Sequence, residues 1–123
     1  MTRKVFLSNF TDWTTPSNSQ LVQDLKQYFQ QKELPTSIGR DAPLNRPKDA
    51  LFAGLMHIHI GDFNEVTYQY YRTSDDWIIY ASGLYTDSVL LIDVLSPNAH
   101  SRAEQMDLMN QYIKLADEFR NKL

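Results

Sequence analysis

Hydrophobic and polar residues alternate along the stretch Leu55–Ile60. Every second residue from Met56 onward is a large apolar one, and His57 and His59 fill the positions between them. Side chains of a β-strand point alternately to the two faces of a sheet, so this pattern predicts a strand. One of its faces is expected to be buried, and the other is expected to carry the two imidazoles in or beside a cleft.

The same reasoning predicts four further strands, at Lys4–Leu7, Thr67–Arg72, Trp77–Ser82 and Val89–Leu95. The polar stretch Ser74–Asp76 is typical of a tight turn, so Thr67–Arg72 and Trp77–Ser82 are expected to pair as an antiparallel hairpin. Val89–Leu95 is almost continuously apolar, as in strands that are covered on both faces. We therefore expect it in the middle of the sheet.

Two stretches show the spacing of amphipathic helices. In Ser17–Glu33 the apolar residues recur at helical intervals, and Thr15 followed by Pro16 is typical of a helix start. Pro35 is expected to end this helix. A second helix is predicted over Ala99–Asn121, with an apolar stripe formed by Ala103, Met106, Met109, Tyr112, Ile113, Ala116 and Phe119.

The stretch Thr36–Asp49 contains Gly39, Pro43 and Pro47 and shows no periodicity, which predicts a long loop. Connections longer than about 12–15 residues are uncommon unless they bind something or stay mobile. The predicted order is β-α-loop-β-β-β-α, an α+β fold in which helices pack on a mostly antiparallel sheet. The 123 residues fit a single domain, 1–123.

Composition narrows the setting and the class of partner. The chain has no cysteine, which excludes disulfides and thiolate metal sites and favours a reducing cytoplasm. It has no apolar run of the roughly 18–20 residues that a membrane span needs, and we expect no contact with a membrane. The net charge of -3 is a poor match for a nucleic-acid binder. However, Arg40, Arg46 and Lys48 surround a single acid, Asp41, and predict a local basic patch.

His57 and His59 are the strongest candidates for catalytic residues. Side chains two positions apart on a strand lie roughly 6–7 Å apart, close enough to act on opposite sides of one bond. Imidazole titrates near neutral pH and suits general acid or base work. Two alternatives stay open: either ring is only a hydrogen-bonded strand residue, or the pair binds a metal. A metal would need a third ligand, for which the sequence offers Asp41, Asp93 or His100.

Cationic side chains supply candidates for phosphate binding. Arg40 could hold a phosphate through two hydrogen bonds, or it could pair with the neighbouring Asp41 in a turn. Arg72 ends a predicted strand near Tyr70 and could stabilise the charge of a pentavalent phosphorane, while the tyrosine orients the base. Alternatively, Arg72 forms a salt bridge with an aspartate of the Ser74–Asp76 turn.

His100 lies at the start of the last predicted helix. The positive end of the helix dipole opposes protonation there and attracts anions. The alternative is a helix-start residue without a function.

Several short motifs, taken together and in order, resemble the YafO family of type II toxins. The resemblance covers about Leu34 to the C-terminus. It rests on Leu34-Pro35, Gly39-Arg40-Asp41-Ala42, His57-Ile58-His59, Arg72-Thr73-Ser74-Asp75, Leu90-Leu91-Ile92, Leu95-Ser96-Pro97, His100, Lys114, Ala116 and Phe119-Arg120. It implies a ribosome-dependent mRNA interferase that enters the ribosomal A site, a cognate antitoxin that inhibits it, and an architecture related to RelE-like toxins. The positions that match the family motifs are Arg40, Asp41, His57, His59, Arg72 and His100.

Cleavage of RNA without a metal or other cofactor needs a base, an acid and a cation for the phosphorane. We assign the acid and base to His57 and His59 and the cation to Arg72, with His100 as a further catalytic candidate. Residues expected to bind the mRNA are Arg40, Asp41, Arg46, Lys48 and Tyr70. The alternative is a non-catalytic RelE-like module that blocks translation or captures a protein partner.

Overall fold

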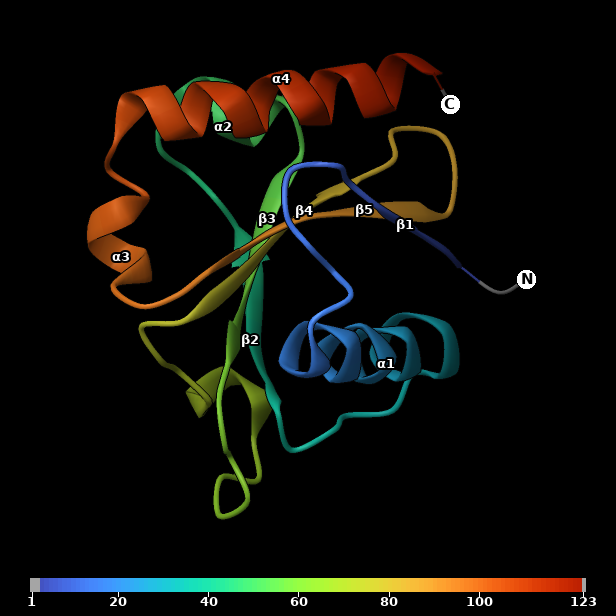
Figure 1. Ribbon diagram of the computed structural model, residues 1–123, viewed down its shortest axis with the longest axis vertical. Helices are drawn as coiled ribbons and strands as arrows, with labels where there is room; N and C mark the ends of the chain where they lie inside the picture. The colour runs from blue at the N-terminus through green and yellow to red at the C-terminus, as the bar shows by residue number, and fades with distance from the viewer. Residues whose placement is uncertain (1–2, 123) are drawn as a thin grey trace.

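Five strands form one sheet in the computed structural model, which describes residues 3–122 (Figure 1). The strands are β1 (Lys4–Leu7), β2 (Ile38–Pro43), β3 (Leu55–Ile60), β4 (Trp77–Ser82) and β5 (Ser88–Leu95). Their order across the sheet is β1-β5-β4-β3-β2. Strand β1 is parallel to β5, and every other neighbouring pair is antiparallel. The predicted α+β fold with a mostly antiparallel sheet is confirmed.

Helices lie on both faces of this sheet. They are α1 (Pro16–Gln31), α2 (Lys48–Phe52), α3 (Ala99–Arg102) and α4 (Met106–Lys122), with a short 3-10 helix, η1 (Gln69–Tyr71). Figure 1 shows α1 on one side of the sheet and α4 with α2 on the other. Among residues 3–122, no helix is both long and apolar enough to cross a membrane.

Each helix stripe builds one of two hydrophobic cores. In α1, Leu25 and Phe29 pack against Ile58 and Ile78 of the sheet. The α4 core is formed by Leu44, Ala50, Ala53, Leu55, Trp77, Ile79, Ala81, Leu90, Ile92, Leu95, Ala99, Met109, Tyr112, Ala116 and Phe119. Full burial of one such large side chain contributes about 1.5–3 kcal/mol. The sheet is therefore apolar on both faces, which is why β4 and β5 read as continuous apolar runs.

The start of α1 follows its predicted chemistry. The Thr15 hydroxyl oxygen accepts a hydrogen bond from the amide of Asn18, 3.3 Å away, and Pro16 occupies the first turn. Thr15 thereby satisfies one of the free N–H groups at the helix start. The helix ends before Lys32, whose φ of 56° is left-handed.

The predicted long loop Thr36–Asp49 is wrong, because it contains β2. This strand pairs with β3 at the edge of the sheet, with Asp41 opposite Ile58 and Ala42 opposite His57. The sequence of β2 shows no alternation of apolar and polar residues, because its pairing with β3 shifts register between Ile38 and Asp41. A Cβ at Gly39 would collide with the backbone oxygen of Arg72, so glycine is needed there for close packing.

The predicted strand Thr67–Arg72 is also wrong, as is its hairpin with Trp77–Ser82. On one side β4 pairs antiparallel with β3, and the segment before the Ser74–Asp76 turn forms η1. With β5 on its other side, β4 has no free edge for a further strand. The exposed tyrosines that suggested a strand therefore lie on a surface turn.

The predicted last helix is divided into α3 and α4. Helix α3 is held by the turn before β4, because Ala99 donates its N–H to the Asp75 carbonyl, 2.9 Å away. Helix α4 instead follows the hydrophobic face of the sheet. Because α3 is held at the turn while α4 packs along the sheet, the helix is interrupted between Arg102 and Met106. The predicted interior position of Val89–Leu95 is confirmed, since β5 lies between β1 and β4.

Candidate functional site

Two imidazoles and an indole share the α4 face of the sheet. His59 lies opposite Trp77 in the pairing of β3 with β4. The ring centroids of His57 and His59 are 5.3 Å apart, and those of His57 and Trp77 are 4.5 Å apart. Trp77 is 7% exposed, and its Nε1 donates to the Ser74 carbonyl oxygen, 3.1 Å away. The buried indole thus holds both imidazoles on one side of the strand.

The third histidine of the chain joins the same indole from α3. The ring centroids of His100 and Trp77 are 6.1 Å apart, and the rings meet edge to face. The His100 side chain is exposed, and its backbone N–H donates to Asp75 Oδ1 at 2.8 Å. We call His57, His59, Trp77 and His100 the histidine surface.

The hydrogen bond of His57 fixes its tautomer. Its Nδ1 lies 2.9 Å from the carbonyl oxygen of Ala42, which can only accept, so Nδ1 carries the proton. The lone pair of the neutral ring is therefore on Nε2. Burial is the largest cause that lowers the pKa of His57 to about 4; the charges of His59 and Arg40 contribute to the shift, and the Ala42 bond opposes it. His57 is neutral near pH 7 and has a free acceptor nitrogen.

His59 has a different environment. Its Nδ1 lies 2.8 Å from both the amide nitrogen and the carbonyl oxygen of Ser74. The amide can donate to an unprotonated Nδ1, and the carbonyl can accept from a protonated one, so a partner exists for either form. Burial lowers the pKa of His59, the Ser74 bond opposes this, and the charge of Arg40 adds to it. His59 can therefore gain or release a proton without losing its hydrogen bond.

Arg40 is the cation beside the two imidazoles. Its positive charge contributes to the lowered pKa of both His57 and His59. Its guanidinium carbon lies 4.4 Å from the ring centroid of Tyr70, a cation–π contact that holds the side chain at the β2 edge. Tyr70 itself is 62% exposed. Arg40 and Tyr70, both expected to bind substrate, are thus side by side.

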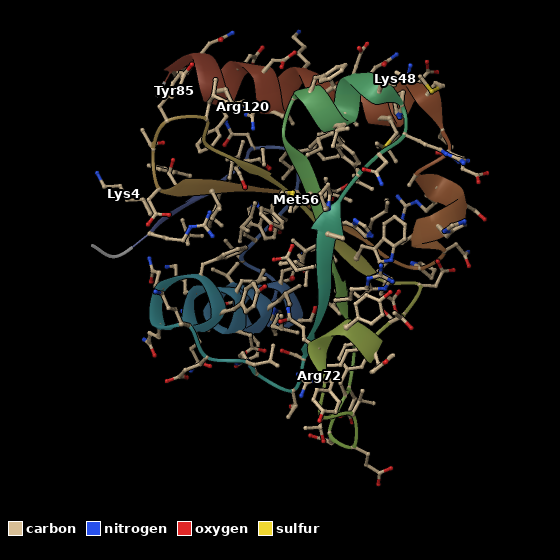
Figure 2. All side chains as sticks on the ribbon, turned by 180° about the vertical axis from the view of Figure 1, so that it is seen from behind. Lys4, Lys48, Met56, Arg72, Tyr85 and Arg120 are labelled. Carbon is tan, nitrogen blue, oxygen red and sulfur yellow. The ribbon has the colours of Figure 1, made fainter. Side chains whose placement is uncertain are left out.

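The structure does not place Arg72 with the histidines as a phosphate ligand. The residue is 6% exposed, and its guanidinium donates to three backbone carbonyl oxygens. These are the oxygens of Val66 at 2.7 Å, Ile38 at 3.0 Å and Pro35 at 3.1 Å. Figure 2 shows Arg72 beside η1, at the base of the sheet. Neither the predicted contact with phosphate nor the alternative salt bridge to the turn fits these bonds; Arg72 joins the loops around β2.

Asp41 lies on the opposite, α1 face of β2. Its carboxylate accepts hydrogen bonds from the hydroxyls of Tyr28 and Tyr80, both at 2.7 Å. Burial raises the pKa of Asp41, while the two tyrosine bonds oppose the shift. Asp41 therefore pairs with tyrosines and not with Arg40, the alternative expected from the sequence.

Two of the three possible third ligands of a metal, Asp41 and Asp93, are separated from the histidine pair, whereas His100 borders the same indole. Asp41 is on the other face of the sheet, and Asp93 lies two strands from His57, where it accepts a hydrogen bond from the buried Tyr112. Among residues 3–122, no three histidine or carboxylate side chains form a group that could bind a metal ion.

Arg46 and Lys48 are exposed and follow β2 at its Ala42 end. Ala42 is the strand partner of His57, so this stretch leaves the sheet next to the histidine surface. Figure 2 shows Lys48 at the α2 end of the stretch, at the opposite end of the molecule from Arg72. The expected basic patch therefore consists of Arg40 and of the separate, exposed side chains of Arg46 and Lys48.

Sequence reasoning missed the role of Trp77 and of the Ser74 backbone. A tryptophan at the start of a predicted strand suggests core packing, and its position opposite His59 follows only from the pairing of β3 with β4. That pairing could have been inferred if η1 had been read as a turn instead of a strand.

A family model described as "Toxin YafO, type II toxin-antitoxin system" matches residues 26–121 of the chain. The matched range includes the whole histidine surface and β2. Searches of curated proteins and of solved structures found no match.

Proposed function

The chain belongs to the YafO family of type II toxin–antitoxin system toxins, and from this premise we propose that it is a ribosome-dependent endoribonuclease that cleaves translated mRNA. The observation that carries the proposal is the pair of imidazoles, 5.3 Å apart, whose pKa values are lowered in part by the charge of Arg40 on the neighbouring strand β2. Membership of a type II system also implies a cognate antitoxin as protein partner.

His57 is the general base of the proposed reaction. Its proton is held on Nδ1 by the Ala42 carbonyl, which leaves Nε2 free to accept the proton of a 2′-hydroxyl. The low pKa of about 4 makes His57 a weak base, but it also keeps the ring neutral at physiological pH. Burial on Trp77 limits the ring to one orientation.

His59 is the general acid. The two Ser74 backbone groups stabilise both of its protonation states, as a residue needs that gives up a proton and regains it. Arg40 offsets the extra negative charge of the phosphorane. Arg40 takes this role in place of Arg72, whose guanidinium is engaged with carbonyls.

The step is a transphosphorylation that needs no metal. The 2′-oxygen gives its proton to His57 Nε2 and bonds to phosphorus, the bond between phosphorus and the 5′-oxygen breaks, and His59 protonates the leaving oxygen. The products are a 2′,3′-cyclic phosphate and a free 5′-hydroxyl. Arg46 and Lys48 contact flanking phosphates, and His100 is a further candidate for the acid because it borders the same indole.

The second candidate function is non-catalytic binding that blocks translation. One observation favours it: a half-buried imidazole with a bonded Nδ1 and a lowered pKa is also what a structural histidine looks like. In that case the histidine surface and the exposed cations would form an interface, and the message would remain intact.

Primer extension on a translated message, with and without ribosomes, tests the proposal. We expect cuts only on translated RNA, and a roughly 10²–10⁴-fold slower reaction in His57→Ala and His59→Ala. The matched control is Tyr85→Ala, since Tyr85 is 93% exposed and lies far from η1 (Figure 2). Growth arrest with intact message would support the non-catalytic alternative and overturn the nuclease.

A further inference from the structure

A cavity lies at the β2 edge, on the far side of the strand from the histidine surface. It has a volume of about 360 Å³ and is lined by Tyr28, Arg40, Asp41, Ala42, Gln69 and Tyr70. A second cavity of about 330 Å³ shares Tyr28, Asp41 and Gln69 with it. Small-molecule pockets begin at about 300 Å³, so each is large enough for one nucleobase. The two cavities are therefore neighbours that share three lining residues.

The lining presents hydrogen-bond acceptors. The hydroxyls of Tyr28 and Tyr80 already donate to Asp41. The side-chain amide of Gln69 donates to the Tyr28 hydroxyl at 3.0 Å and to the Gly39 carbonyl at 2.9 Å. The Tyr28 hydroxyl and the Gln69 amide are thus committed as donors, while each carboxylate oxygen of Asp41 keeps a lone pair. The guanidinium of Arg40 adds a cationic donor to the lining. Within residues 3–122, no donor contacts Gln69 Oε1.

Arg40 and Tyr70 connect this cavity to the histidine surface. Both line the cavity, and the charge of Arg40 also reaches His57 and His59. Because β2 is the last strand of the sheet, an RNA strand can pass around it from one face to the other. The exposed Tyr70 ring offers a surface on which a base can stack, as in many single-stranded RNA sites.

We propose that this cavity binds a guanine base of the mRNA next to the cleaved phosphate, through the acceptors of Asp41 and Gln69. Guanine presents two adjacent donors, N1–H and the N2 amino group, to a carboxylate, whereas adenine, cytosine and uracil present a single donor group on that edge. The inference rests on the proposed function for its link to cleavage. It adds a specificity site to that reaction.

Binding of free nucleotides tests the cavity without any cleavage. The purified protein is titrated with 5′-GMP and with 5′-AMP, and binding is followed by NMR. GMP should shift the signal of the Gln69 side-chain amide, and the protein should bind GMP at least tenfold more tightly than AMP. Asp41→Asn replaces one acceptor by a donor and should abolish the preference. Gln69→Met is the second variant, for use if Asp41→Asn does not fold. Tyr85→Ala should behave as the wild type does.

Mapping of cleavage sites separates this inference from the proposed function. In Gln69→Met the share of cuts beside guanine should fall severalfold, whereas Tyr85→Ala should keep both the total cleavage and the site distribution of the wild type. An unchanged site distribution in Gln69→Met, or equal affinity for GMP and AMP, would overturn the guanine site and leave the nuclease intact. A GMP preference in a wild-type protein that cuts no RNA would support the pocket and reject the nuclease.

Discussion

His57 donates its Nδ1 proton to the carbonyl oxygen of Ala42, its partner on the neighbouring strand, over 2.9 Å. The bond joins the chemistry of the site to the pairing of β2 with β3, because the carbonyl is positioned by the strand register. A shift of β2 by one residue would replace the carbonyl and turn Ala42 to the other face.

The titration of His57 should be far from that of an ordinary imidazole. Its burial against Trp77 lowers its pKa to about 4. In an NMR titration, the His57 ring protons should therefore move with a midpoint near 4, and the same residue in urea should titrate near its ordinary 6.5. A folded-state midpoint at or above 6.5 would contradict the packing described for this ring.

The same residue makes stability depend on pH. Because the pKa of folded His57 is about 4 and its ordinary value is 6.5, the unfolded chain binds more protons between these values. Stability is thus complete above about pH 6.5 and falls as the pH drops toward 4, by about 1–2 kcal/mol for a partly exposed ring. Urea unfolding at several pH values should show this slope. His57→Asn, which keeps a donor for Ala42 but does not titrate, should reduce it.

Substitution of Arg72 should mainly lower stability, whereas substitution of Arg40 should mainly lower the rate of cleavage. Arg72→Met leaves three carbonyl acceptors without their donor and should lower the free energy of unfolding by about 2–4 kcal/mol. Arg40→Met should change stability by less than about 1 kcal/mol, yet reduce cleavage strongly. Urea unfolding and primer extension on the same two proteins measure both effects. A stable, inactive Arg72→Met would restore Arg72 as the phosphate ligand.

Trp77 should influence the titration of His57 and His59 in addition to its contribution to the hydrophobic core. Trp77→Phe and Trp13→Phe each shrink a buried indole, Trp77 being 7% and Trp13 8% exposed, and both should lose stability. Only Trp77→Phe should alter the NMR titration of His57 and His59, because Trp13 belongs to the α1 core. Equal titration curves in both variants would mean that the indole does not set the imidazole environment.

Much of the fold follows from local pattern. The alternation of Leu55–Ile60, the apolar run of Val89–Leu95 and the start of α1 are each encoded within a few residues, and the structure has these elements near the predicted positions. Helix α4 also follows from its stripe. These elements bury regular faces, so the period of the sequence matches the period of the structure.

The rest depends on pairing between distant segments. Strand β2 has no alternation of its own, and η1 has the tyrosines of a strand but no free edge to join. The site shares this dependence: Arg72 ends a stretch whose pattern predicts an exposed strand, yet its guanidinium is buried among carbonyls. Asp41 is next to Arg40 in the chain and faces the other way. No local signal separates these cases, because strand register decides them.

The parallel pair of β1 and β5 has a consequence for the newly made chain. Ser8, just after β1, donates its hydroxyl to the carbonyl of Ile92, 84 positions later. Contacts of such long range are slow to form, since the closing of a large loop precedes any gain from it. Strand β1 therefore has no neighbour in the sheet until β5, which begins 84 positions after it, has been synthesised. Among the five strands of the sheet, β1 is therefore synthesised first but can pair only after β5.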